Sequence, residues 1–291
     1  MRVDAARRPE VLAAHAHCRA VTLRSGSSFA AAFWMFPKEK RQAVHAIYAF
    51  CRFADDVADD PQVVGNRAFL LERWRAELGA AYEGKAVHPV GIALADAVRR
   101  FDLPREIFEE LLHGVESDLE RAGMETFDDV TRYCFRVAST VGILLVRLLG
   151  HRSPRALAYA EAMGIAVQLT NIVRDVGEDA AAGRVYLARE DMRRFGVSPE
   201  SLRADPTPDE LRVLLACYAE RARIYYERAA RLRPEEDRAR LRPADAMGRI
   251  YRALLEEIQR RRFPHAAPAL RLSNARRLAI TASVWLEGAR A

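Results

Sequence analysis

The sequence has little glycine, proline, cysteine and lysine, and each shortage excludes a class of structure. Its 15 glycines and 13 prolines make up just under a tenth of the 291 residues, which leaves no room for a long flexible linker. The four cysteines are scattered and form no C-x-x-C pair. We therefore expect reduced thiols rather than a zinc site or a disulfide framework.

Long uncharged segments are also absent from the sequence. The longest, Ser25–Pro37, has 13 residues, whereas a membrane-spanning helix needs about 20 apolar residues. The first ten residues, MRVDAARRPE, contain no apolar core of a secretory signal. We expect a cytoplasmic protein without a membrane span.

Positive charge is plentiful but spread along the whole chain. Three of the 46 basic residues are lysines and the other 43 are arginines, interleaved with 40 acids to give a net charge of +6. A nucleic-acid-binding chain typically gathers its basic residues in one arm or patch, so we expect no nucleic-acid partner. A weakly basic surface is compatible with peripheral contact at the inner face of an anionic membrane.

Helical periodicity dominates the rest of the sequence, and alternating β-branched runs are absent. Half of the residues are hydrophobic, enough for a large core. Apolar spacing and helix-start residues predict helices after Pro37, over Phe69–Tyr82, Arg105–Glu120, Thr126 towards Gly150, Ser153 to about Gly177, Pro206–Leu232, Pro243–Arg262 and Asn274–Glu287. We expect one all-α domain spanning residues 1–291.

The first unusual segment is the acidic end of the helix after Pro37. Asp55 and Asp59 are four residues apart and Asp56 lies three before Asp59, so their carboxylates share one helical face. Like charges at this spacing repel, and the helix dipole disfavours anions at a C-terminal end. The cluster indicates either a compensating cation, such as a metal ion, or an acidic end that frays into the loop at Pro61.

The second unusual segment ends a helix that is almost free of charge. Between Ala156 and Asn171 the only charged residue is Glu161. Asn171, Asp175 and Asp179 then follow at i, i+4 and i+8, with Gln168 one turn earlier. Because buried carboxylates need a partner or a metal, this stripe predicts a functional site. Three further residues nearby could bind a phosphate: Arg174, Arg184 and Tyr186.

Two oxygen-rich stripes on facing helices suit a hard divalent cation. Mg²⁺, with Mn²⁺ as an alternative, combines one or two carboxylates with substrate phosphates, so the sequence predicts a diphosphate substrate. Aromatic faces stabilise carbocations, and candidates to line such a cavity are Phe29, Phe33, Tyr48, Phe50, Tyr133 and Phe135.

Acids that crowd together repel, so we expect that neutralising Asp55, Asp59, Asp175 or Asp179 leaves stability unchanged or raises it.

Several segments, in this order, resemble the squalene/phytoene synthase family. They are Ser28-Phe29; Tyr48–Arg52 with Asp55, Asp56 and Asp59; Tyr133-Cys134 leading to Val137–Gly142; and Gln168–Asp179 followed by Gly183–Leu187. The resemblance runs from about Arg24 to Leu278. It implies an all-α isoprenoid synthase fold with a central cavity and a head-to-head (1′-1) condensation of two prenyl diphosphates.

The resemblance also implies roles for individual residues. Metal ligands would be Asp55, Asp56, Asp59, Asp118, Asn171, Asp175 and Asp179. Diphosphate contacts would be Arg52, Arg174, Arg184 and Tyr251. Other substrate contacts would be Ser25, Ser27, Ser28, Tyr48, Tyr133, Gln168 and Tyr186, with Phe29 and Phe33 in the prenyl channel. The residues expected to carry catalysis are Asp55, Asp59, Asp175, Asp179, Tyr48 and Arg52.

Within this family the sequence favours a bacterial squalene-synthase-like enzyme of the hopanoid pathway. Such an enzyme would join two farnesyl diphosphates through presqualene diphosphate towards a C30 product. The alternatives are a phytoene synthase that joins two geranylgeranyl diphosphates, another class I prenyl enzyme, and a non-catalytic helical partner subunit. No G-x-G-x-x-G fingerprint occurs, and the sequence leaves NADPH use and the oligomeric state open.

Overall fold

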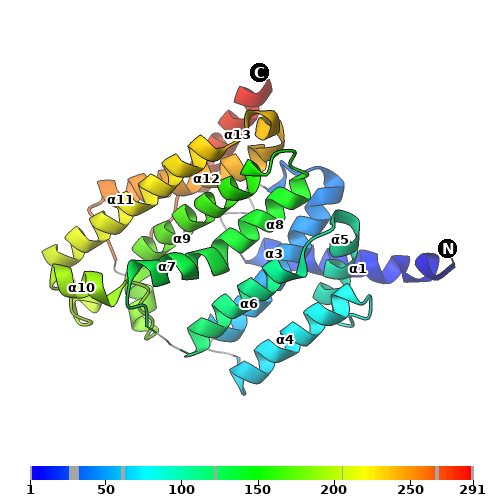
Figure 1. Cartoon of the computed structure of the whole chain (residues 1–291), viewed down its shortest axis with the longest axis horizontal. Helices are drawn as coiled ribbons and strands as arrows, with labels where there is room; N and C mark the ends of the chain where they lie inside the picture. Colours follow the sequence, from blue (N-terminus) through cyan, green and yellow to red (C-terminus); the bar gives the residue numbers. More distant parts are fainter. Residues whose placement is uncertain are drawn as a thin grey trace.

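The computed structural model describes residues 2–25, 33–59, 63–120, 123–204, 206–265 and 269–289. These residues form helices and connecting loops, without a strand among them. The helices pack into the layered bundle shown in Figure 1. The all-α class predicted from the sequence is confirmed.

The first half of the bundle surrounds α3. Its helices are α1 (Arg2–Arg24), α3 (Lys38–Asp59), α4 (Arg67–Tyr82), α5 (Pro89–Phe101) and α6 (Arg105–Glu120). On α3, Val44, Ile47 and Ala54 are fully buried, because their helical spacing presents them to the neighbouring helices. The apolar face of α3 therefore fixes the direction in which its acidic last turn projects.

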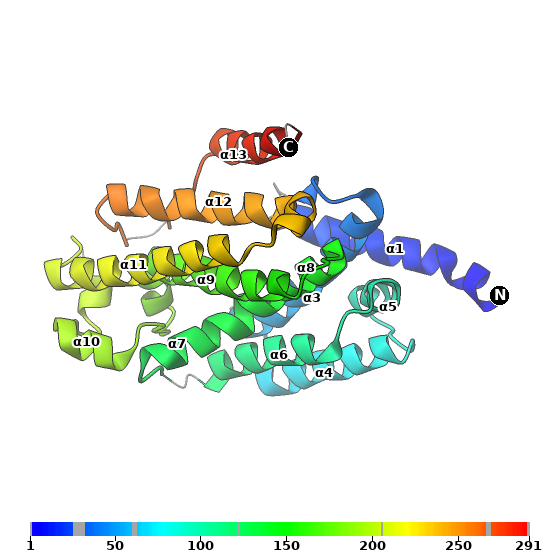
Figure 2. The same ribbon diagram turned by 45° about the horizontal axis from the view of Figure 1, so that its top comes forward.

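The second half of the bundle surrounds α9. Its elements are α7 (Phe127–Cys134), the π-helical turn η1 (Phe135–Ser139), α8 (Thr140–Leu149), α9 (Arg155–Ala181), α10 (Arg189–Phe195), the 3₁₀ turn η2 (Ser201–Arg203), α11 (Asp209–Leu232), the 3₁₀ turn η3 (Glu235–Asp237), α12 (Arg238–Arg260) and α13 (Asn274–Ala289). In Figure 2, α13 forms an outermost layer above α12.

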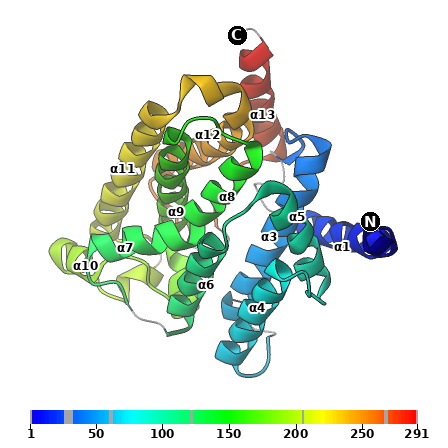
Figure 3. The same cartoon turned by 45° about the vertical axis from the view of Figure 1, so that its right-hand side comes forward.

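The helix α9 is the core of this half, with α8, α11 and α12 packed around it. Among the described residues it is the one helix that is long and apolar enough to cross a bilayer, yet 67% of its apolar window is buried inside the protein. Its neighbour α8 also packs against α3, as Figure 3 shows from the side. This packing holds α3 and α9, the two acid-bearing helices, in one framework.

Several element boundaries differ from the sequence-based expectations. The helix start predicted at Thr126 is confirmed, and Thr126 forms a capping box with Asp129. The helix that follows contains a π-helical turn before α8. The helix expected to begin at Pro243 begins at Arg238 instead, directly after the 3₁₀ turn η3, so Pro243 lies inside α12. The sequence analysis did not predict the helices α1, α5 and α10.

Candidate active site

The acidic end of α3 is neutralised by arginines of the protein itself. Arg52 Nη2 lies 2.6 Å from Asp56 Oδ1, one helical turn away. Arg67, the first residue of α4, donates from Nη1 to the backbone carbonyls of Val57, at 2.8 Å, and Ala58. A guanidinium at this position offsets the helix dipole. The compensating charge that the acids require is thus supplied at least partly by arginine.

The predicted residues Asp55 and Asp59 also belong to this last turn. Asp55 is half-buried on α3. Asp59 ends the helix, but its side chain lies outside the described residues. The role of this pair as metal ligands therefore remains a prediction.

The stripe on α9 begins with two amides. Asn171 Nδ2 donates to Gln168 Oε1 at 3.1 Å, one turn earlier on the same helix. Asn171 Oδ1 is buried and has no hydrogen-bond partner. A buried oxygen without a partner costs free energy, so this atom is suited to receive a cation or a donor from a ligand.

The two acids of the stripe are each engaged by an arginine. Arg174 holds Asp175 in a bidentate pair, with Nε–Oδ1 at 2.6 Å and Nη2–Oδ2 at 2.5 Å. Arg184 Nη2 lies 3.8 Å from Asp179 Oδ1. The four side chains are each about one-fifth exposed, so these pairs are well shielded from water. The predicted phosphate-binding arginines therefore lie directly beside the predicted metal-binding acids.

Tyr251 of α12 connects this stripe to α3. Burial raises the pKa of the Tyr251 phenol. The hydrogen bond with Arg174, and the positive charge of Arg174, lower this pKa. Asp175 and Tyr48 raise the pKa further, which places Tyr48 of α3 within electrostatic range of Tyr251. Predicted site residues from three helices therefore converge here.

A second group of predicted residues meets at Asp118, near the end of α6. The Asp118 carboxylate accepts hydrogen bonds from Tyr133 Oη at 3.1 Å and from Tyr186 Oη at 2.9 Å. The two phenol rings are stacked, with their centroids 4.9 Å apart. Burial and the negative Asp118 raise the pKa of both phenols, so both stay protonated as donors. Asp179 and Arg184 also act on Tyr186, which joins this group to the α9 stripe.

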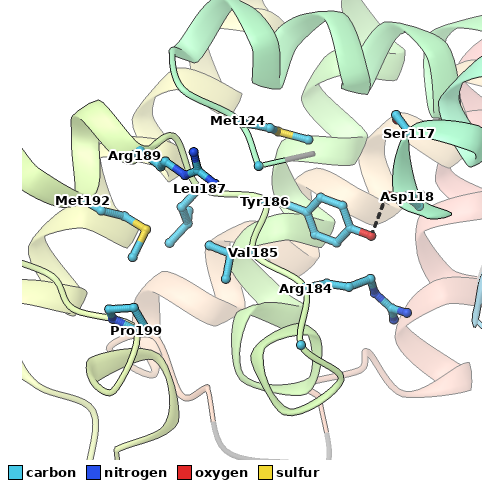
Figure 4. A pocket seen from close by; sticks show the side chains of 12 residues that line it. Ser117, Asp118, Met124, Arg184, Val185, Tyr186, Leu187, Arg189, Met192 and Pro199 are labelled. Carbon is cyan, nitrogen blue, oxygen red and sulfur yellow. Dashed lines mark hydrogen bonds between the residues drawn. The ribbon is translucent and has the colours of Figure 1, made fainter. Parts of the chain in front are cut away.

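A pocket of about 330 Å³ opens beside this second group. Figure 4 shows Asp118, Tyr186 and Arg184 along one side of it. Met124, which precedes α7, and Leu187, the residue after Tyr186, contribute apolar surface. The pocket therefore combines a polar side, suited to an anion, with an apolar wall.

The predicted prenyl-binding segment is described in part. Tyr48 Oη donates to Ser25 Oγ at 2.9 Å, which closes the end of α1 against α3. Phe33 is 4% exposed and packs edge-on against the Tyr48 ring, with centroids 5.9 Å apart. Three predicted substrate contacts in this segment, Ser27, Ser28 and Phe29, lie outside the described residues.

The described part of the site fits a divalent cation only in combination with a ligand. Among the described residues no three His, Cys, Asp or Glu side chains are gathered as a metal site. The available donors are nonetheless all oxygens, and Asn171 Oδ1 is buried without a partner. Such a donor set matches a hard cation that takes its remaining ligands from a substrate phosphate.

Residues that the sequence analysis missed hold the loop with Arg184 and Tyr186 in place. Tyr218 Oη accepts a hydrogen bond from the backbone N–H of Ala188 at 2.8 Å and donates to Asp191 at 3.2 Å. Arg221 binds both oxygens of Asp191. Tyr218 and Arg221 lie on α11, about 30 residues away in sequence, so no local spacing reveals the connection.

Comparison with known proteins identifies the family. The model of the squalene/phytoene synthase family matches residues 22–281, nearly the whole chain. The chain belongs to this family. The chain is therefore a prenyltransferase of the head-to-head group, as the resemblance of its motifs implies.

Relatives of this chain carry several different names. A phytoene synthase of Arthrospira platensis is 34% identical over 84% of each chain. A presqualene diphosphate synthase of Rhodopseudomonas palustris is also 34% identical, over 88% of this chain and 91% of the relative. The crystal structure of a dehydrosqualene synthase in complex with ligand superimposes with a TM-score of 0.86, at 31% identity over 97% of this chain and 99% of that one. These similarities establish the reaction family but not the prenyl chain length.

Proposed function

We propose that this chain condenses two molecules of farnesyl diphosphate head to head, through presqualene diphosphate, towards a squalene-type C30 product for hopanoid or other triterpenoid synthesis. The observation that carries the reaction type is the pairing of the two α9 acids with arginines: Asp175 with Arg174 of the same helix, and Asp179 with Arg184 of the loop that follows it. This arrangement places cation ligands and diphosphate donors side by side. The relatives named presqualene diphosphate synthase and dehydrosqualene synthase support the proposal.

The residues of the chain divide the work of ionising the first substrate. Arg174 and Arg184 offer guanidinium N–H groups to diphosphate oxygens. Asp175, Asp179 and Asn171 on α9, with the predicted Asp55 and Asp59 on α3, would hold Mg²⁺ or Mn²⁺. When bound, this cation neutralises the leaving diphosphate.

The second substrate then reacts with the allylic cation. As the allylic C–O bond breaks, its electron pair leaves with the diphosphate. The double bond of the other prenyl chain attacks the cation and, with loss of a proton, gives a cyclopropylcarbinyl diphosphate. The aromatic rings of Tyr48 and Phe33, one against the other, would exclude water and stabilise positive charge. A second ionisation and rearrangement would set the 1-1′ bond.

Phe33 supports the assignment of the fifteen-carbon substrate. Its ring is buried against Tyr48 and meets Phe36 edge-on, and such a fixed ring would limit the length of the prenyl channel. We expect Phe33→Leu to raise the ratio of geranylgeranyl to farnesyl diphosphate turnover at least about fivefold, roughly 1 kcal/mol in relative barrier. Phe108→Leu removes the same volume from a fully buried ring on α6 and should leave this ratio unchanged.

A phytoene synthase is the second candidate, because the relatives at 34% identity include proteins with that name. Purified enzyme is incubated with each prenyl diphosphate, with and without NADPH, and the extracted products are identified. A C30 hydrocarbon or presqualene diphosphate from farnesyl diphosphate supports our proposal. Turnover of the twenty-carbon substrate at least as fast as the fifteen-carbon one contradicts it. A requirement for NADPH would decide whether this chain also performs the reduction.

A further inference from the structure

The outer face of α13 is apolar, unlike that of an ordinary surface helix. Thr281 and Val284 are buried against the rest of the bundle. On the other side, Leu278 and Leu286 are each 59% exposed. The exposed residues that complete this stripe are Ala275, Ala279 and Ala282. A surface helix normally carries charged residues there, so the face requires an explanation. We call Ala275, Leu278, Ala279, Ala282 and Leu286 the α13 outer face.

Two exposed tryptophans extend this apolar surface towards the substrate site. Trp285 of α13 and Trp34 are 46% and 42% exposed, and their ring centroids are 5.9 Å apart. Trp34 directly follows Phe33, the residue that packs against Tyr48. Arg41 fixes this turn through a hydrogen bond from Nη2 to the Trp34 carbonyl at 2.7 Å. The tryptophan pair thus links α13 to the segment that contains Phe33.

A positively charged cluster lies where α12 ends and α13 begins. Arg260, Arg261 and Arg276 all bind the single carboxylate of Glu257. Three guanidinium groups on one carboxylate leave an excess of two positive charges. Within the described part of α13, Glu287 is the sole acid, and it pairs with Arg249 at 2.6 Å.

We propose that the α13 outer face, with Trp34 and Trp285, lies on the surface of a membrane that contains anionic lipids. Leucine and tryptophan on one side with arginines beside them are typical of helices that bind in the interfacial plane. The excess positive charge around Glu257 would meet the lipid headgroups. A symmetric dimer through this face explains the surface less well, because the single acid of α13 already has a partner.

Vesicle flotation of the full chain tests this proposal without substrate, so its result is independent of the proposed reaction. We expect binding to vesicles with about 30% phosphatidylglycerol, weaker binding to pure phosphatidylcholine, and loss of binding in about 0.5 M NaCl. The variant Leu278→Gln/Leu286→Gln should lower the vesicle partition coefficient at least about tenfold. The control Phe69→Gln/Val213→Gln changes residues that are 61% and 54% exposed on α4 and α11, and should stay within about twofold of wild type.

Tryptophan fluorescence of the unmodified chain provides a second measurement that needs no variant. Brominated lipids should quench the emission of Trp34 and Trp285, whereas Trp74 is packed against Phe53 and His88. Absence of flotation and quenching, or equal losses in both double variants, would overturn the proposal. A lipid-free dimer that Leu278→Gln/Leu286→Gln converts to monomer would overturn it in favour of a second copy of this chain.

Discussion

Replacing Asp175 by Asn separates the structural role of the α9 acids from their role in turnover. In the structure Asp175 is held by two short bonds from Arg174, and both side chains are only about one-fifth exposed. Breaking a fully buried ion pair costs about 3–5 kcal/mol and breaking an exposed one about 0–1 kcal/mol. Because Asn retains one acceptor oxygen for Arg174, we expect Asp175→Asn to lower the free energy of unfolding by about 1–2 kcal/mol.

This expectation differs from the prediction made from the sequence, in which neutralising Asp175 leaves the metal-free protein equally stable or more stable. That prediction rests on repulsion between neighbouring carboxylates. In the structure Asp175 is paired with the guanidinium of Arg174, so neutralising Asp175 would also lose this attraction. Urea unfolding of the metal-free protein measures the difference. The double variant Arg174→Gln/Asp175→Asn removes both charges and should recover most of the lost stability.

Asp175→Asn should reduce turnover by more than its loss of stability alone would explain. If Asp175 helps to bind the cation that neutralises the leaving group, kcat/KM should fall at least ~100-fold, about 2.7 kcal/mol in transition-state stabilisation. The assay is release of diphosphate against Mg²⁺ concentration. The stabilised double variant should be at least as inactive, because it lacks the Asp175 carboxylate and also the Arg174 guanidinium that would contact the diphosphate.

Asp209→Asn is the matched control for both measurements. Asp209 begins α11, its side chain is 92% exposed, and it pairs only at the surface with Arg212. Its stability should change by less than about 0.5 kcal/mol and its kcat/KM by less than about threefold. Near-normal diphosphate release by folded Asp175→Asn at saturating Mg²⁺ would refute the metal role, and an unchanged unfolding free energy would refute the role of the ion pair.

Three further predictions concern the framework around the site. Burial and nearby positive groups lower the pKa of His45 to about 4 in the folded protein. As the pH falls, the unfolded chain therefore binds this proton at a higher pH than the folded chain does. The free energy of unfolding, measured with urea, should fall by up to about 3 kcal/mol between about pH 6.5 and 4. Gly177→Ala would place a Cβ 2.0 Å from the backbone carbonyl oxygen of His265. We expect thermal melting to show a stability loss of about 1–3 kcal/mol, and diphosphate release to show a lower kcat/KM. Tyr218→Phe leaves the N–H of Ala188 unpaired, and should cost about 1–3 kcal/mol in urea unfolding and slow diphosphate release.

Each of these predictions has a control within the chain. His45→Gln should flatten the pH dependence of stability, and an unchanged slope would contradict the assignment. Gly79→Ala places its Cβ at an ordinary 3.6 Å from Arg105, so it should raise stability by about 0.5–1 kcal/mol. Tyr82→Phe loses a hydrogen bond to the Leu103 carbonyl far from the site, and should reduce stability without affecting turnover. Equal effects of the Tyr82 and Tyr218 variants on turnover would contradict the positioning role of Tyr218.

The sequence alone was sufficient for the helical class, the family and the placement of the acids on their helices. Asn171, Asp175 and Asp179 recur every four residues after a nearly uncharged segment, and α9 indeed contains all three. Such local patterns survive folding because helical periodicity depends on residues only a few positions apart. The family motifs combine several of these local patterns, and for that reason they could be recognised without coordinates.

Only the tertiary structure decided which charges neutralise these acids and which side chains share the site. Asp118, Tyr133 and Tyr186 come from three different segments, and Tyr218 reaches the loop at Ala188 from α11. Partners of this kind depend on how helices pack, and sequence spacing contains no information on distances between elements. The same limit applies to α13: Leu278 and Val284 are equally apolar in sequence, but packing against the bundle buries Val284 and leaves Leu278 exposed.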